Sequence, residues 1–318
     1  MKKILLLGLI ILVLVGCGSS KDETTFKIGI LQWAEHAALD DAAQGLISEL
    51  ESMGLDKVEI IHKNANDDNS AANLIVGQFV DAGVDLIYAI ATPAAQVAVS
   101  ATEGTDIPVV FNAVTDAVSA GLVESNEKPN GRVTGVSDMA PIDTQLALIK
   151  EFLPKANAVG VIYNTGEDNS VHQIALIESL IGNHGMTLNV QGVSSAQEIA
   201  LASEQVTANS DAIYIITDNM IAKAAPQVVG IANEIKVPVF MAESGQIDQG
   251  ILASDSISYF GLGTQAARMV KSILVDGINP GDIPVEISQT TSLFVNEKVA
   301  LELGVEIPDS ILERATLK

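Results

Sequence analysis

Four hydroxyl and carboxyl side chains follow predicted strands, where they could hold the two charges of a small zwitterion. Thr92 and Ser170 lie at predicted helix N-termini, where a hydroxyl and free backbone N–H groups can bind a carboxylate. Asp218 and Glu243 follow two later strands and could pair with an ammonium group through charge-assisted hydrogen bonds. Trp33, the only Trp of the chain, offers a flat face to an aromatic or cationic group. Together these five residues would suit an amino acid.

Each of these residues also has a purely structural interpretation. Thr92 and Ser170 could be ordinary helix caps, and Asp218 could cap the helix that follows it. Glu243 could be a solvated loop charge, and Trp33 could belong to the core. The ligand-site hypothesis rests on the set, because all five positions converge on one predicted cleft.

That cleft follows from an alternation of apolar strands with amphipathic helices. Residues 27–31 are typical of a buried strand, and apolar residues then recur at helical spacing up to the terminating Gly54. The same pattern predicts strands at 58–61, 85–90, 108–111, 159–163, 188–193, 212–216, 238–241 and 251–254, and helices at 71–82, 94–101, 142–152, 171–183, 196–209, 222–235 and 262–275. The alternation predicts an α/β fold with parallel sheets covered by helices on both faces. In such sheets, ligands bind beyond the carboxyl ends of the strands.

The alternation starts again after Gly135, which predicts two doubly wound lobes of similar build. Hydrophobic residues make up 48% of the chain, enough to supply a core for each lobe. About 290 residues follow the N-terminal segment, and this length suits two domains.

The N-terminus has the pattern of a lipoprotein signal peptide. Lys2 and Lys3 precede an apolar run at 4–15 that is too short to span a membrane, since a spanning helix needs about 20 residues. Leu14-Val15-Gly16-Cys17 resembles the bacterial lipobox, and Cys17 is the only Cys of the chain. We therefore expect cleavage after residues 1–16, lipidation of Cys17, and a flexible tether at 17–25. A plain secretion signal with an incidental Cys is the alternative.

Charge and missing motifs exclude several classes of function. Without residues 1–16 the chain carries 15 Lys and Arg against 40 Asp and Glu, a net charge of −25 that disfavours nucleic acid and anionic lipid as partners. The four His residues lack metal-ligand spacing, no GxxxxGK[ST] loop is present, and residues 242–246 lack both glycines of a GxSxG elbow. The sequence predicts no enzyme, no cofactor and no metal.

An ordered set of stretches carries a family resemblance over nearly the whole chain after the tether. These stretches are IGILQWAEHAALDDAAQG (28–45), ATPAAQ (91–96), FNAVTDAVSAGL (111–122), VTGVSD (133–138), VGVIYNTGEDNS (159–170), ITDN (216–219), PVFMAES (238–244) and GLGTQAARM (261–269). The chain resembles the ABC-transporter substrate-binding lipoproteins of the tryptophan/tyrosine type, which have a type I periplasmic-binding-protein fold. It departs from the family at 166–168, where relatives often carry Ser-Glu-Ala, and at 243–244, where a second acid is common.

The resemblance implies two lobes that close on a ligand by hinge motion. Crossings near Asp138, Ser254 and Pro284 would give an N-terminal lobe of 26–138 plus 255–284 and a C-terminal lobe of 139–254 plus 285–318. The resemblance also implies that backbone N–H groups join Thr92 in holding the carboxylate, and that other residues line the pocket. The residues implied in this way are Ala94 and Ala95 for the carboxylate, Asn219 beside Asp218 for the amino group, Ser170 and Glu243 on the other side, and Trp33 with the Asn112, Ala113 and Val114 loop around the ligand side chain.

The predicted function is capture of a small solute, an aromatic amino acid by preference, for an ABC permease and its ATPase. The protein would be lipid-anchored on the extracytoplasmic face of the cell membrane, with no other membrane contact. Two alternatives remain open at this point. The ligand could be a nucleoside, a sugar or another organic solute, or the protein could report its ligand state to a membrane receptor, because this fold serves both outputs.

Overall fold

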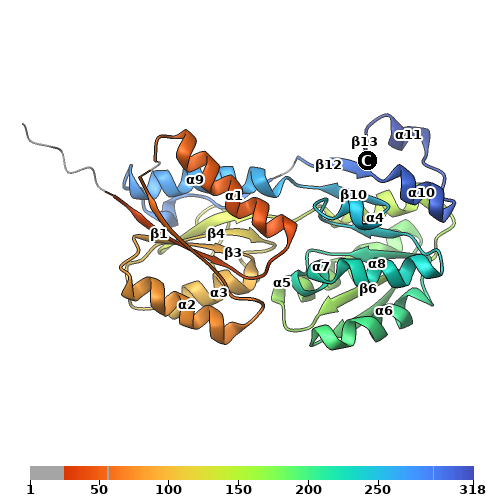
Figure 1. The fold of residues 1–318 in the computed structure, drawn as a ribbon, viewed down its shortest axis with the longest axis horizontal. Coiled ribbons are helices and arrows are strands. Elements are labelled where there is room, and N and C mark those ends of the chain that lie inside the picture. Colours follow the sequence, from red (N-terminus) through yellow and green to blue (C-terminus); the bar gives the residue numbers. More distant parts are fainter. Residues whose placement is uncertain (1–24, 56, 289) are drawn as a thin grey trace, which may run out of the picture.

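The computed structural model describes residues 25–318 except 56 and 289 (Figure 1). The predicted signal peptide and Cys17 lie outside the described residues. Within the described part of the chain, no helix is both long enough and apolar enough to span a membrane. Two lobes lie side by side along the long axis of the molecule, each built on its own sheet.

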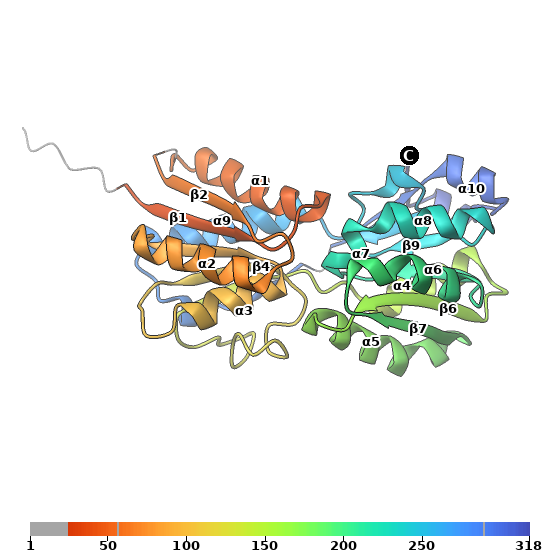
Figure 2. The same ribbon diagram turned by 60° about the horizontal axis from the view of Figure 1, so that its bottom comes forward.

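The N-terminal lobe is a parallel sheet with helices on both faces. Its strands follow the order β11-β5-β4-β3-β1-β2. Their bounds are β1 Lys27–Gln32, β2 Glu59–Asn64, β3 Leu86–Ile90, β4 Val109–Val114, β5 Val133–Ser137 and β11 Glu286–Ile287. Helices α1 (Ala37–Ser52) and α9 (Tyr259–Leu274) cover one face, and α2 (Asn69–Asp81) and α3 (Thr92–Ala101) cover the other (Figures 1 and 2).

The C-terminal lobe repeats this plan with the order β13-β12-β10-β9-β8-β6-β7. Its strands are β6 Ala158–Asn164, β7 Thr187–Val193, β8 Ala212–Ile215, β9 Val239–Met241, β10 Ala253–Ser256, β12 Ser292–Val295 and β13 Thr316–Leu317. Its helices are α4 Ile142–Phe152, α5 Asp168–Leu180, α6 Ile199–Thr207, α7 Asn219–Lys223, α8 Ala225–Glu234, α10 Glu297–Leu303 and α11 Asp309–Leu312, with short 3₁₀ turns at Ile181–His184, Ala196–Glu198 and Ile247–Gln249. Two strands depart from the predicted parallel order, because β12 runs antiparallel to β10 and β13 runs parallel to β12.

Alternate residues of the second sheet feed two separate cores. Val161 and Tyr214 pack with α4 and α5 on one face, whereas Ile162 and Ile213 pack with α6 and α8 on the other. This split is the period of two that a strand imposes on its side chains. Both faces are apolar because both are covered, which is why the strands appear in the sequence as continuous apolar runs.

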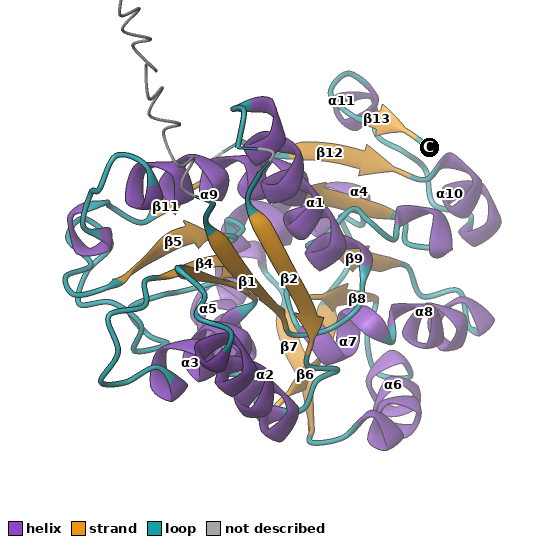
Figure 3. Cartoon of the chain, turned by 60° about the vertical axis from the view of Figure 1, so that its left-hand side comes forward, coloured by secondary structure: helices purple, strands orange, loops and turns teal. Residues whose placement is uncertain are grey.

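The predicted fold class is confirmed: each of the two α/β lobes has a sheet flanked by helices (Figure 3), and the chain crosses between the lobes three times. The crossings lie between β5 and α4, between β10 and α9, and between β11 and β12. The predicted lobe boundaries need two small corrections, because residues 255–256 still pair within the second sheet and residues 286–287 still pair with β5 in the first. At 255–256 the strand pairing extends beyond the apolar run that predicted the strand, and at 286–287 a two-residue strand pairs without any apolar run to mark it.

One predicted helix is two helices in the structure. The segment predicted as a single helix at 222–235 begins earlier, as α7, and restarts as α8 after a break at Ala224. Pro226 lies in the first turn of α8. Proline has no N–H and clashes with the preceding turn, so it is tolerated there and not in a helix interior.

Candidate ligand site between the lobes

The N-terminal lobe brings the carboxyl ends of three adjacent strands together at the cleft. Trp33, directly after β1, donates its backbone N–H to the Ile90 carbonyl at 3.2 Å, and Ala91 donates its own to the Asn112 carbonyl at 2.9 Å. All seven predicted N-lobe site residues are buried, and they are Trp33, Thr92, Ala94, Ala95, Asn112, Ala113 and Val114. The fold therefore collects residues that are up to 81 positions apart into one edge of one sheet.

Two alanines at this edge have backbone conformations that L-residues rarely adopt. Ala91 has φ 84° and ψ 154°, and Ala113 has φ 54°. Such conformations cost on the order of 1–3 kcal/mol each and concentrate at functional sites. Ala113 also lies where the pairing of β4 with β5 shifts register. The strained pair therefore marks the ends of β3 and β4 as candidate ligand-binding backbone.

Helix α3 points its N-terminus into this edge. Thr92 and Ala94 lie in the first turn of α3, so their N–H groups find no acceptor within the helix. The buried Thr92 Oγ1 has no hydrogen-bond partner among the described residues. Ala95, in contrast, donates its N–H to the Ala91 carbonyl at 3.0 Å, so this predicted donor is already occupied.

The segment 112–114 differs from its prediction. It is the end of strand β4 and not a loop, because a bulge lets the ladder continue past Phe111. The Asn112 side chain donates to the Tyr88 hydroxyl and accepts the Ala113 N–H at 2.6 Å. Asn112 therefore holds Tyr88 and the Ala113 backbone in place, and its side-chain amide already has these partners within the protein.

In the C-terminal lobe, Asp218 and Ser170 satisfy each other. The Ser170 hydroxyl donates to Asp218 Oδ2 at 2.7 Å, and the Asn164 N–H donates to the same oxygen at 2.6 Å. Asp218 Oδ1 accepts the Ile221 N–H at 2.9 Å and caps α7. Ser170 lies in the first turn of α5 and not before the helix. The helix-cap interpretation of Asp218 is therefore the one that its contacts favour.

Glu167 and Asn219 form a second internal pair. The Asn219 side chain donates to Glu167 Oε2, and the N–H groups of Asn219 and Met220 also donate to this carboxylate, at 3.2 and 3.3 Å. The Asn169 side chain donates to the Thr217 carbonyl at 2.9 Å and leaves its buried Oδ1 without a partner. Glu167 and Asn169 were not predicted, since a helix-starting acid and amide give no separate signal in a sequence.

Glu243 is the acid in this cleft that lacks a donor. It is 4% exposed, and among the described residues no hydrogen bond reaches its carboxylate. The imidazole of His36 lies beside it, with Nδ1 3.7 Å from Glu243 Oε2. Burial, followed by the charges of Asp138, Asp218 and Glu167, raises the pKa of Glu243 to about 8. A cation bound beside it would reverse this shift.

The hydrogen bonds across the cleft each involve at least one residue that the sequence analysis left out of the site. His36 Nε2 lies 3.4 Å from Asn219 Oδ1, and the hydroxyls of Thr115 and Thr217 lie 3.4 Å apart. The lobes also meet through Gln96, whose side chain donates to Asp168 at 2.7 Å. No predicted N-lobe site residue has a hydrogen bond to a predicted C-lobe one in the described part of the chain. A lone His after a strand has no sequence signature that could have indicated this bridging role.

Several buried acids surround the cleft, and together with Glu243 they form what we call the acid-rich wall. Burial raises the pKa of Asp138, which accepts from the Tyr259 hydroxyl at 2.8 Å and from Thr115 at 3.2 Å. Burial and the charge of Glu167 raise the pKa of Asp218, and burial lowers the pKa of His36. The wall therefore carries several acids and a neutral imidazole, which favours a ligand that brings a positive charge.

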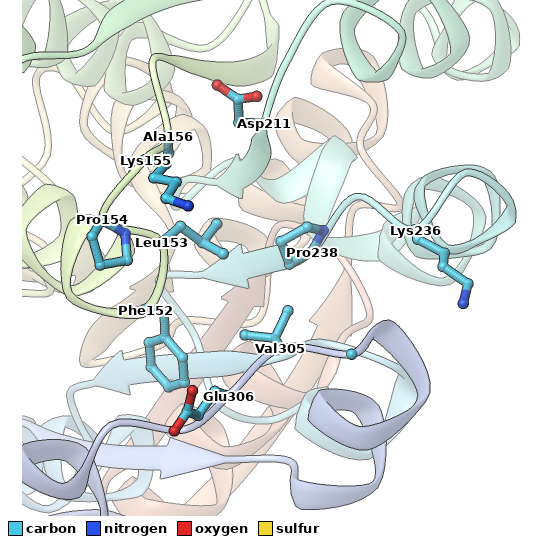
Figure 4. A pocket seen from close by; sticks show the side chains of 11 residues that line it. Phe152, Leu153, Pro154, Lys155, Ala156, Asp211, Lys236, Pro238, Val305 and Glu306 are labelled. Atoms are coloured by element: carbon cyan, nitrogen blue, oxygen red, sulfur yellow. The ribbon is translucent and has the colours of Figure 1, made fainter.

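A hollow elsewhere on the C-terminal lobe is separate from this cleft. It has a volume of about 470 Å³ and is lined by residues 152–156 with Lys236, Pro238 and Val305 (Figure 4). It lies where β6, β8 and β9 begin, whereas the predicted site residues follow the ends of these strands. None of the predicted site residues lines it.

Comparison with known proteins identifies the family. The model of the ABC transporter substrate binding protein family matches residues 27–318. A tyrosine-binding protein of Clostridioides difficile is 40% identical over 283 residues, which are 88% of this chain and 81% of that protein. The family consists of substrate-binding proteins and not of enzymes.

Two solved relatives bear on the lobe arrangement. The ABC domain in complex with L-Trp from Streptococcus pneumonia shares 37% identity and a TM-score of 0.89, and the match covers 92% of this chain and 99% of that one. A ligand-free, open substrate-binding protein with adhesive properties from Clostridium difficile shares 38% identity at the same coverage and has a TM-score of 0.70. At equal coverage and near-equal identity, this chain is arranged more like the L-Trp complex, in keeping with its interlobe contacts. The chain thus belongs to the family of ABC transporter substrate-binding proteins.

Proposed function

We propose that this protein captures an aromatic amino acid between its lobes and delivers it to an ABC importer. The observation that carries the proposal is the distribution of unsatisfied groups in the cleft. The N-terminal lobe offers free donors at the start of α3, and the C-terminal lobe offers Glu243, a buried acid without a donor. This arrangement complements a carboxylate on one side and an ammonium on the other. A tyrosine-binding relative and an L-Trp-bound relative support the choice of ligand class.

The contacts also refine the predicted site. Thr92 and the Ala94 N–H would hold the carboxylate, since the positive end of α3 adds to their hydrogen bonds. Glu243 would hold the ammonium in place of Asp218, whose oxygens already accept three hydrogen bonds. Trp33, which is 5% exposed and has an unpartnered Nε1, would lie against the ligand side chain. Ser170, Asn219, Asn112, Ala113 and Val114 would shape the pocket without binding the charges.

A panel of ligand fragments tests this proposal. Isothermal titration calorimetry with the purified chain should give tight binding of L-tryptophan, L-tyrosine or L-phenylalanine. Tryptamine, which lacks the carboxylate, and indole-3-propionate, which lacks the ammonium, should each bind at least about 100-fold more weakly, because each loses a buried charge contact. A nucleoside or a sugar that binds tightly while all three amino acids fail would overturn the ligand class.

We also propose that the mature protein is held on the extracytoplasmic face of the cell membrane by a lipid on Cys17. The support is the lipobox-like Leu14-Val15-Gly16-Cys17 and the position of Cys17 as the only Cys. Labelling of cells with an alkyne fatty acid should mark the wild-type chain and not the Cys17→Ser variant, and the variant should leave the membrane fraction. Deletion of the gene should reduce uptake of the bound amino acid if a permease and ATPase depend on this protein.

A further inference from the structure

An ion pair joins the two lobes at the rim of the cleft, outside the proposed ligand contacts. Lys223 Nζ lies 2.7 Å from Asp67 Oδ2, with side-chain exposures of 46% and 21%. Asp67 follows β2 in the N-terminal lobe, and Lys223 ends α7 in the C-terminal lobe. Because the two residues belong to different lobes, opening of the cleft must break this pair.

The Asp67 side of the pair is held by an unusual turn behind Trp33. Asn66 and Asp67 have φ of 54° and 62°, two successive left-handed residues in a short loop. The Asn64 side chain accepts the Asn66 N–H at 2.7 Å, and the Trp33 carbonyl accepts the Asp67 N–H at 3.0 Å. Asn and Asp tolerate this conformation better than other residues with a side chain. The turn therefore fixes Asp67 to the backbone of the one Trp in the site.

The Lys223 side of the pair belongs to the helix that carries a site residue at its other end. Asp218 caps α7, and Asn219, its first residue, reaches His36 of the opposite lobe. Helix α7 is five residues long, so Lys223 lies about one helical turn after Asn219. The ion pair of Lys223 thus links the N-terminal lobe to α7, the short helix that forms part of the acid-rich wall.

We propose that Asp67 and Lys223 are positioning residues that hold the closed cleft and slow the release of the bound solute. The pair exists only when the lobes are together, so it adds to the stability of the closed state and leaves the open state unchanged. It should therefore affect the dissociation rate and leave the association rate nearly constant. The proposal uses the proposed function only for the choice of L-tryptophan as a probe.

The expected effect is modest because the pair is partly exposed and salt screens it. Surface ion pairs of this kind change an equilibrium by about two- to fivefold. The hydrogen bond from Gln96 to Asp168 spans the cleft elsewhere and remains in every variant, so closure itself should persist. The effect should shrink at high ionic strength, where the Debye length falls to about 3 Å at 1 M salt.

Three variants isolate the pair. Asp67→Asn keeps a residue that accepts the left-handed turn, Lys223→Gln keeps most of the side-chain length, and the double variant completes a mutant cycle. Arg268→Gln is the matched control, because it removes a 3.2 Å bridge to Glu49 inside the N-terminal lobe. Surface plasmon resonance at low salt should show L-tryptophan leaving each single variant about two- to fivefold faster, the double variant no faster than either single variant, and the control unchanged.

A second measurement needs no ligand. Fluorescence energy transfer between dyes on the two lobes of the ligand-free protein should show a smaller closed fraction in the three pair variants than in the wild type and the control. Wild-type dissociation rates and closed fractions in both single variants, or additive effects in the double variant, would overturn the pair's role. If L-tryptophan fails to bind the wild type, the proposed function fails instead, and the closed fraction alone then decides the role of the pair.

Discussion

Replacement of Glu243 by Gln tests most directly whether the cleft recognises the ammonium group of its ligand. Gln has the same shape and removes only the charge. Glu243 is 4% exposed, accepts no hydrogen bond among the described residues, and lies beside other acids that raise its pKa to about 8. A buried acid in this state gains most from a ligand ammonium, and loss of one partner of such a pair costs about 2–4 kcal/mol. We therefore expect L-tryptophan to bind Glu243→Gln about 30- to 900-fold more weakly.

The assay compares two ligands on three proteins by isothermal titration calorimetry at pH 8.5. Indole-3-propionate lacks the ammonium, so Glu243→Gln should bind it as well as the wild type does, or better. Glu204→Gln makes the same exchange at an exposed position of α6 and should leave both affinities unchanged. An equal loss for both ligands in Glu243→Gln would refute the reasoning, because a general distortion of the site and not a missing charge would then explain it.

Asp218 provides the contrasting case on the same lobe. Its carboxylate accepts N–H groups from Asn164 and Ile221 and the Ser170 hydroxyl, all within the C-terminal lobe. Asp218→Asn should therefore lower the melting temperature of the protein, because Asn can keep the cap of α7 but places an N–H donor where Oδ2 accepts hydrogen bonds from the Asn164 N–H and the Ser170 hydroxyl. Its effect on L-tryptophan affinity should be much smaller than that of Glu243→Gln. A larger loss of affinity at Asp218 would return the ammonium to that residue.

Three further predictions test the electrostatics, the packing and the helix terminus. In the closed cleft the pKa of Glu243 is about 8, against an ordinary value of 4.5, so closure on a ligand without an ammonium takes up a proton below pH 8. Indole-3-propionate should therefore bind the wild type more tightly as the pH falls from 8.5 to 6. A pH-independent affinity would contradict this. Gly263→Ala places a Cβ 2.3 Å from the Ala42 carbonyl oxygen and should lower stability by about 1–3 kcal/mol in chemical denaturation, whereas Gly77→Ala meets nothing and should raise it by about 0.5–1 kcal/mol. Thr92→Val should weaken L-tryptophan binding by about 5- to 30-fold with little change in melting temperature, because its hydroxyl has no partner in the ligand-free protein.

Much of the fold could be predicted because each long strand and helix carries its own periodic signal. The strands β3 and β8 are uninterrupted apolar runs, and α4 occupies the predicted residues 142–152. The elements that the pattern missed are short or exposed. Strands β11 and β13 have two residues each, and these residues are exposed, so neither length nor apolarity marks them. Their pairing is a tertiary effect that no local pattern encodes.

The site could be predicted as a set of positions but not as a set of roles. Asp218 and Glu243 look alike in the sequence, since each acid follows an apolar strand. What separates them is the count of donors around each carboxylate, which depends on where Asn164 and Ser170 are folded. The contacts of His36 with the other lobe could not be predicted either, because its partners lie 183 and 207 positions away in the sequence.

The closed arrangement of the lobes buries polar groups that have no protein partner on either lobe, within the part of the chain that the structure describes. Trp33 Nε1, His36 Nδ1, Thr92 Oγ1 and Asn169 Oδ1 all lack partners among the described residues, and Glu243 lacks a donor. Buried groups without a partner disfavour the closed state, so the closed fraction of the protein without a ligand should be the minor one. A zwitterion that reaches both walls removes much of this cost, whereas a ligand that reaches one wall does not. The unsatisfied polar groups thus favour closure on a ligand that carries both charges, and we expect a rim contact as weak as that of Asp67 with Lys223 to affect how long the closed state lasts.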